Sequence, residues 1–101
     1  MKLLLITAIR EFDKEIKSIL KKAEVTHYSY KKVIGFRDAS ELSIQENWFA
    51  SEMNESKSIF FYAFVKKENV AIVFELVEAF NEKQKSDSTI HLAMLNIEKT
   101  N

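Results

Sequence analysis

Arg37 is the residue of this chain best placed to bind an anion, because it follows the only glycine and opens a long polar stretch. The run Val33-Ile34-Gly35-Phe36-Arg37 ends a strand-like segment, and glycine at such a junction supplies a backbone exception that other residues resist. A guanidinium there could pair with a phosphate or a carboxylate. The alternative is a solvated arginine that only begins a loop.

A second group of anion-binding candidates precedes the last strand-like segment. Lys83 and Lys85 flank a turn that also contains Ser86 and Ser88, and ammonium and hydroxyl groups together could hold an anion. The alternative is that these lysines only complement the dipole of a helix C-terminus, where cations are favoured.

Catalytic and metal-binding signals are weak. The chain contains no cysteine, which excludes disulfides and thiolate chemistry, and it shows neither a Ser-His-Asp order nor a glycine-rich phosphate loop. His27 and His91 are weak metal candidates, because their spacing matches no ligand motif and ordinary hydrogen-bonded strand histidines explain them. We therefore predict no catalytic residues and a protein that is not an enzyme.

Trp48 and Phe49 form an aromatic pair within a stretch rich in glutamate. Exposed aromatic residues in a loop are typical of partner-docking sites, because such residues dominate interface energetics. The alternative is that the pair folds back and packs on the protein's own assembly.

Length and composition indicate one domain, residues 1–101, in which 47% hydrophobic residues can form one small core. The formal net charge is zero, and basic and aromatic residues are not interleaved, which argues against nucleic-acid binding. The apolar run of residues 2–9 is more typical of a buried strand than of a signal sequence. No run approaches the roughly 18 residues of a membrane span, so we expect a cytoplasmic protein.

Hydrophobic periodicity predicts four strands and two helices. Strands are expected at residues 2–9, 25–36, 58–66 and 90–97. One helix begins at Phe12 and buries Ile16, Ile19, Leu20 and Ala23, and a second, capped by Asn69, continues to about Lys83. Residues 37–57 carry no sustained period and are interpreted as a long loop.

This order, β-α-β-β-α-β, predicts an α+β fold of the ferredoxin-like type: a four-stranded antiparallel sheet with two helices on one face. Three of the strands are apolar in both phases, so the helices leave a second apolar face uncovered. Such a face is too costly to leave in water, because burial is worth about 25 cal/mol per Å2. We therefore expect an oligomer with facing sheets.

The chain resembles the PII nitrogen-regulatory family, whose corresponding strand ends in a sequence such as Val-Lys-Gly-Phe-Gly-Arg. Gly35 and Phe36 match this pattern, and Arg37 matches when one glycine is deleted. The resemblance covers essentially the whole chain. It implies a homotrimer with inward-facing sheets, a nucleotide at the clefts between subunits, and a T-loop at residues 37–57 that docks on target proteins.

The turn before the last strand departs from the family. Nucleotide-binding members carry a turn such as Thr-Gly-Lys-Ile-Gly-Asp-Gly-Lys-Ile, of which only Asp87 and Ile90 remain, and Thr89 replaces the phosphate-binding lysine. The arginines that follow the last strand are also missing, so adenine nucleotide is a doubtful cofactor. By the resemblance, the ligand-binding candidates are Gly35, Phe36, Arg37, Lys85, Asp87 and Thr89.

These observations predict a trimeric signalling protein that senses a small ligand at subunit clefts and binds a partner protein, such as a transporter or an enzyme, through its long loop. Two alternatives remain open. One is a trimeric adaptor with a degenerate ligand site, linked to a metal transporter. The other is a small dimeric enzyme of ferredoxin-like topology, a fold that leaves little motif.

Overall fold

The computed structural model describes residues 1–36 and 55–101. Along the chain, the elements are β1 (Lys2–Ile9), the 3-10 helix η1 (Arg10–Phe12), α1 (Asp13–Lys22), β2 (Ser29–Phe36), β3 (Glu55–Val65), α3 (Lys67–Lys83) and β4 (His91–Asn96). The first strand and the end of the long helix lie where the sequence predicts them.

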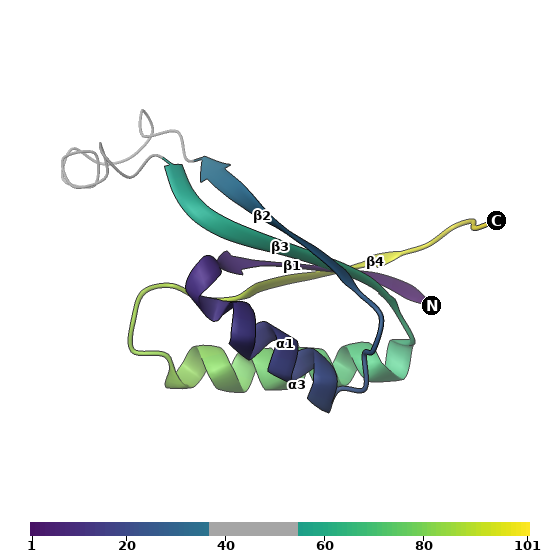
Figure 1. Cartoon of the computed structure of the whole chain (residues 1–101). Coiled ribbons are helices and arrows are strands. Elements are labelled where there is room, and N and C mark those ends of the chain that lie inside the picture. The colour runs from purple at the N-terminus through teal and green to yellow at the C-terminus, as the bar shows by residue number, and fades with distance from the viewer. Residues whose placement is uncertain (37–54) are drawn as a thin grey trace.

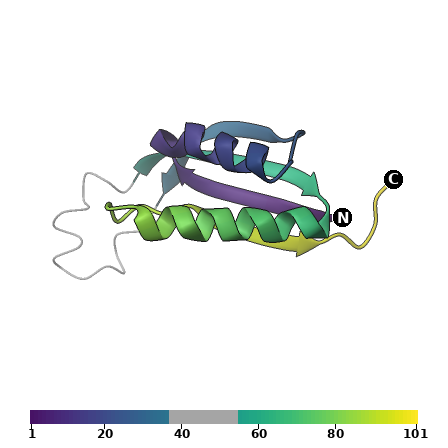
Figure 2. The ribbon, with the colours of Figure 1, turned by 90° about the horizontal axis from the view of Figure 1, so that it is seen from below.

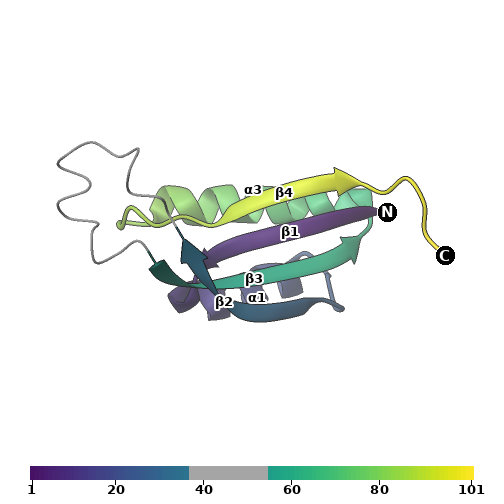
Figure 3. The same ribbon diagram turned by 90° about the horizontal axis from the view of Figure 1, so that it is seen from above.

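The strands form one sheet in the order β2-β3-β1-β4, with every neighbouring pair antiparallel. Both helices cover the same face of this sheet, and none of the described elements covers the other face (Figures 1 and 2). Seen from the uncovered side, the four strands lie in front of the helices (Figure 3). The predicted ferredoxin-like α+β architecture is therefore confirmed.

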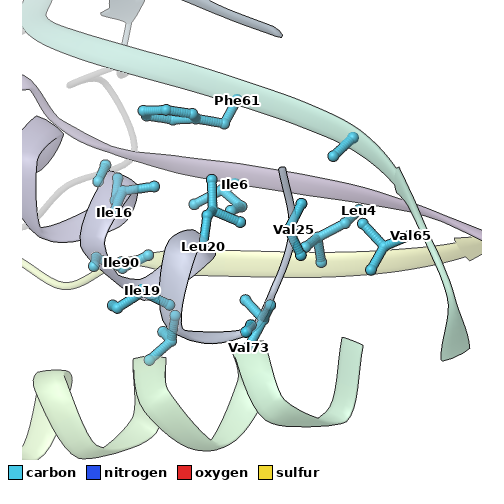
Figure 4. Close-up of a cluster of buried hydrophobic side chains, with 14 of the residues drawn as sticks. Leu4, Ile6, Ile16, Ile19, Leu20, Val25, Phe61, Val65, Val73 and Ile90 are labelled. Carbon is cyan, nitrogen blue, oxygen red and sulfur yellow. The ribbon is translucent and has the colours of Figure 1, made fainter. Parts of the chain in front are cut away.

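The core lies between the sheet and the two helices (Figure 4). Alternate residues of a strand point to the same face, and Leu4 and Ile6 of β1 are almost fully buried beside Phe61 of β3. Ile16 and Leu20 of α1 meet them from the helix layer. The apolar stripe that the sequence predicts for the first helix is buried throughout.

Both helices have ends that the sequence did not predict. α1 ends in a Schellman motif, in which Val25 N donates to Leu20 O at 2.9 Å and Glu24 adopts a positive φ of 62°. The predicted cap of the long helix is wrong: α3 begins at Lys67, and Asn69 N already donates to Lys66 O within the first turn. Asn69 is therefore a helical residue, and no side chain caps this helix.

Two strand boundaries also differ from the prediction. The second strand begins at Ser29 rather than at residue 25, because residues 23–25 close the Schellman motif. The third strand begins at Glu55, three residues before position 58, and pairs along its start with the end of β2. Residues 55–57 of the loop predicted at 37–57 therefore belong to β3. Residues 37–54 lie outside the described part of the chain.

The β2–β3 pair continues beyond the end of β1. Ile9, the last residue of β1, is opposite Ser58, whereas β2 and β3 pair on as far as Phe36 and Glu55. We call this two-stranded extension, residues 34–36 and 55–57, the ribbon.

The second face of the sheet is apolar and uncovered within the described residues, as predicted. Tyr62 and Phe64 of β3 are 43% and 56% exposed on it. Leu5 lies between Tyr62 and Ala93, and Leu3 lies between Phe64 and Leu95, so the side chains form continuous rows across three strands. We call this surface the open face.

Candidate functional site

Gly35 lies within β2, one residue before the end of the strand, and not at a position with unusual backbone dihedral angles. Its φ is not positive, so the expectation of unusual backbone geometry is wrong. The space around it explains the glycine better: an added Cβ would lie 2.8 Å from Ser56 Oγ and 3.0 Å from Ser58 Oγ. These two hydroxyls are 3.2 Å apart and lean across the strand pair into the position that a side chain would occupy.

Phe36 is the last residue of β2, and its side chain is 73% exposed. Because neighbouring residues of a strand point to opposite faces, Phe36 points to the helix side of the ribbon and Gly35 belongs to the open side. One ligand therefore cannot rest against both positions on the same face. Arg37, Trp48 and Phe49 lie outside the described residues.

Arg10 is a residue at this end of the sheet that the sequence analysis did not identify. Its Nε donates to Ser58 O at 3.0 Å and its second guanidinium nitrogen donates to Val33 O at 3.1 Å. The partly buried side chain thus joins the end of β1 to both strands at the base of the ribbon. An arginine just after a buried strand was the only sequence signal for it.

The turn before β4 is held by Asn81 of α3. Its Nδ2 donates to Ile90 O at 3.0 Å, and its Oδ1 accepts from Ile90 N at 2.9 Å. Two further amides of the turn are also engaged by side chains, Lys85 N by Gln84 Oε1 and Ser88 N by Ser86 Oγ. These amides are not directed at an external phosphate, in contrast to a glycine-rich cradle.

The ligand candidates of this turn are accessible. Lys85 and Asp87 are exposed, and Thr89 is half-buried next to the buried Ile90. Sequence reasoning identified these side chains but not Asn81, whose side chain fixes the turn's position on the helix.

The two groups of ligand candidates lie at the same end of the sheet but on opposite edges. β2 ends where β4 begins, because β2 and β1 run in one direction and β4 in the other, and β3 and β1 lie between them. With strands about 4.8 Å apart, three steps place the two edge strands about 14 Å from one another. The single chain therefore does not bring Gly35 and Phe36 together with Lys85, Asp87 and Thr89.

A cavity of about 600 Å3 lies at the other end of β2, lined by Thr26, His27, Ser29, Tyr62 and Phe64 among others. It combines hydroxyl and imidazole groups with two exposed aromatic rings on the open face. Its volume is within the range of small-molecule pockets. This cavity was not predicted, because its residues come from the segment before β2, from the start of β2 and from β3, and the sequence alone does not show that these lie side by side.

The two histidines are not brought together. His27 precedes β2 and lies within hydrogen-bond distance of Thr26 Oγ1, at 3.0 Å, whereas His91 begins β4 at the opposite end of the sheet. Among residues 1–36 and 55–101, no group of three metal-ligating side chains is present. The weak metal candidates thus have no shared site within one chain.

The strand order and the two helices on one face define a ferredoxin-like α+β domain of the type found in PII-like proteins. Its structure superposes on CPII, a nitrogen regulatory PII-like protein from Thiomonas intermedia K12 solved with ADP, AMP and bicarbonate, with a TM-score of 0.63 at 16% identity. The match covers 98% of this chain and 93% of CPII.

Two further structures extend the similarity. A PII-like signalling protein from Thermus thermophilus matches with a TM-score of 0.59 at 16% identity, covering 95% of this chain and 85% of that one. A DUF3240 family protein from Shewanella baltica matches with a TM-score of 0.66 at 13% identity, covering 99% and 92%. The chain matches no protein-family model and no curated protein sequence. The predicted resemblance to PII-like proteins is thus confirmed in the fold.

Neither helix in the described part of the chain is long and apolar enough to cross a membrane.

Proposed function

We propose that this chain is a PII-like regulatory protein without catalytic activity, which assembles as a homotrimer and senses a small ligand at the clefts between subunits. The observation that carries the proposal is the whole-chain similarity to PII-like proteins, joined to an apolar open face that one chain leaves exposed. Packing three open faces inward would bury Leu3, Leu5, Tyr62 and Phe64.

The split between the two edges supports a ligand site between subunits. Gly35 and Phe36 lie on the β2 edge, and the 84–90 turn leads into the β4 edge, at the same end of the sheet. When one subunit places its β2 edge beside the β4 edge of the next, both groups enter one cleft. Arg37 would then join Lys85, Asp87 and Thr89 around an anionic ligand.

Calorimetry tests the sensing function. ADP, AMP and bicarbonate, the ligands found in CPII, and divalent metal ions are titrated into the wild-type protein and into Arg37→Ala. We expect at least one anion to bind and Arg37→Ala to weaken it at least tenfold, whereas a matched Lys99→Ala variant binds normally. Undiminished binding by Arg37→Ala would remove that residue from the site.

We further propose that residues 37–57 bind a partner protein, with Trp48 and Phe49 as anchors, and that the ligand favours one state of the segment by its differential affinity. Pull-down with wild-type protein and with a variant lacking residues 41–54 tests this role. Equal recovery of a partner by both forms would exclude it.

One observation favours the alternative of an adaptor with a degenerate ligand site, linked to a metal transporter. The amides of Lys85, Ser88 and Ile90 are already used within the turn, so the phosphate cradle of nucleotide-binding relatives has no equivalent there. A trimer of three times 11.8 kDa that gives no heat with any of these ligands supports the adaptor. A mass of twice 11.8 kDa instead favours a dimeric enzyme.

A further inference from the structure

The helix side of the ribbon carries exposed apolar side chains between lysines. Residues Lys32, Ile34 and Phe36 alternate along β2 on the side shared with the buried Ile59 and Phe61, and the register places Lys57 opposite Ile34. We call Lys32, Ile34, Phe36 and Lys57 the ribbon patch.

Nothing in the described part of the chain covers this patch. Ile34 is 57% exposed and Phe36 is 73% exposed, although both continue the row of side chains that the helices bury farther along the sheet. Lys17 of α1 lies with its Nζ 4.2 Å from the centre of the Tyr30 ring, and the preceding η1 meets the base of the ribbon through Arg10, which donates to Val33 O and Ser58 O. β1 has already ended at Ile9, so beyond Ser58 the ribbon has neither a third strand nor a helix beneath it.

The patch itself carries two positive charges, whereas the segment that follows Arg10 carries the acidic residues Glu11 and Asp13. Lys32 and Lys57 are exposed and take part in no ion pair within the described residues. At the base of the ribbon, Arg10 donates to two backbone carbonyls, which satisfy N–H groups without neutralising the charge. Among residues 34–36 and 55–57, the only acidic side chain on this side is Glu55, opposite Phe36.

We propose that the ribbon patch binds an acidic peptide segment of a partner protein, which inserts a large apolar side chain against Ile34 and Phe36 and places carboxylates beside Lys32 and Lys57. This inference rests on the proposed regulatory role and specifies the chemistry of the partner. The patch lies on the helix side of the sheet, so covering the open face does not bury it; only Phe36, at the end of β2, also borders the proposed cleft between subunits.

Charge complementarity favours an acidic peptide as the ligand of the ribbon patch. Apolar burial provides affinity at the centre of such a contact, and opposite charges at its rim provide orientation and speed of association. An anionic membrane is disfavoured, because the chain has no net charge and the patch exposes only two large apolar residues on a narrow ribbon.

A competing occupant is the chain's own segment 37–54, which joins the two strands of the ribbon. It contains one basic residue and four acidic ones, a net charge of minus three; the charged residues are Arg37, Asp38, Glu41, Glu46 and Glu52. The experiment therefore has to distinguish a segment in cis from a partner in trans.

Selection of random 12-residue peptides displayed on phage, with the full chain as bait, identifies the preferred chemistry. We expect enrichment of sequences in which Asp or Glu flanks Trp, Phe or Leu. A synthetic peptide of the most enriched sequence is then titrated by fluorescence anisotropy. Enriched peptides without an acidic excess would overturn the proposal.

Two matched pairs of variants locate the binding site. Ile34→Ser and Lys57→Glu should each weaken the peptide at least tenfold, whereas Ile72→Ser, which alters a similarly exposed apolar residue on α3, and Lys99→Glu should change affinity less than twofold. Equal losses in the patch and control variants would overturn the assignment. Circular dichroism of each variant confirms that the fold persists.

The variant lacking residues 41–54 distinguishes binding of a partner peptide from binding of the chain's own segment. Unchanged affinity in this variant supports a partner in trans, and an increase of tenfold or more shows that the chain's own segment occupies the patch and overturns the proposal. The proposed trimer can be refuted independently of the ribbon patch. A chain that is monomeric in solution but binds the peptide through Ile34 and Lys57 would support the ribbon patch and refute the sensor at the subunit clefts.

Discussion

At the scale of single residues, Glu24 shows how a local conformation can conflict with its side chain. It is the only described residue other than glycine with a positive φ, and it holds the position at which Schellman motifs prefer glycine. A left-handed conformation costs an L-residue about 1–2 kcal/mol. Glu24→Gly should therefore raise the free energy of unfolding by about 0.5–1 kcal/mol, after the larger unfolded-state entropy of glycine is subtracted.

Urea denaturation at neutral pH measures this gain as a shift of the midpoint. Glu24→Ala is the matched control, because it removes the carboxylate but keeps the Cβ that makes the conformation costly. A gain in both variants would show that charge, rather than backbone strain, is responsible.

Arg10 makes the opposite case, because its removal takes one hydrogen-bond donor from each of two backbone carbonyls. Arg10→Met keeps much of the side-chain volume but deprives Ser58 O and Val33 O of their donors in a partly buried site. We expect a loss of about 1–3 kcal/mol in the free energy of unfolding. The amides of the ribbon should also exchange faster with solvent, as measured by hydrogen exchange.

Arg10→Lys separates charge from geometry, since a lysine can restore at most part of the forked contact. An intermediate stability is expected. If Arg10→Met were as stable as the wild type, the two hydrogen bonds would not tie β1 to the ribbon.

Lys17 illustrates a residue that stays charged across the physiological range. Its hydrogen bond to Asp13 first, and then that to Tyr30, raise the pKa of its ammonium group above 10.5. Since the folded pKa is raised, the contribution to stability is complete below 10.5 and is lost only as the pH rises through the folded value. The ammonium partner of the Lys17–Asp13 pair, with 3.1 Å between Nζ and Oδ1, therefore stays charged throughout the neutral range.

At the scale of elements, the sequence predicted what depends on periodicity. The strand at residues 2–9 and the buried stripe Phe12, Ile16, Ile19 and Leu20 follow from hydrophobic spacing alone. Element ends were less predictable: Asn69 is a good cap by type, yet Lys66 supplies the carbonyl that begins the helix. The opposite facing of Gly35 and Phe36 follows from the alternation along a strand, but which of the two faces the helices depends on strand register, which composition does not encode.

The stability of the turn before β4 depends on Asn81. Asn81→Ala removes both contacts to Ile90 and leaves a partly buried amide and carbonyl without partners. We expect a loss of about 1–3 kcal/mol in the free energy of unfolding and faster exchange of the Ile90 amide. Gln84→Ala, which removes only the exposed contact to Lys85 N, should lose less than about 0.5 kcal/mol.

The same pair of variants tests whether the turn is a degenerate ligand site. Asn81→Ala frees the Ile90 amide, so an anion that binds through the turn's backbone would bind Asn81→Ala no more weakly than the wild type. An anion that depends on the fixed position of the turn would instead bind more weakly. Calorimetry with ADP distinguishes the two.

At the scale of the whole molecule, the sequence predicted that one face of the sheet would be apolar and uncovered by the helices. No described element of the single chain covers that face. The helix layer buries the central part of one face, as the near-zero exposure of Leu4 and Ile59 shows, while the open face keeps its aromatic residues in solvent. A fully buried large apolar side chain contributes about 1.5–3 kcal/mol, so several such residues favour association strongly. The sign of this effect does not depend on the number of subunits.

A charge on the open face should therefore dissociate the assembly without unfolding the subunit. Tyr62→Asp places a carboxylate in the centre of the proposed interface, and Ile72→Asp places one on α3 at similar exposure, 40% against 43%. We expect light scattering to give three times 11.8 kDa for the wild type and Ile72→Asp, and 11.8 kDa for Tyr62→Asp. A wild-type chain that stays monomeric at micromolar concentration, or a Tyr62→Asp variant that still forms trimers, would contradict assembly through this face, and with it the completion of the ligand site by a neighbouring subunit.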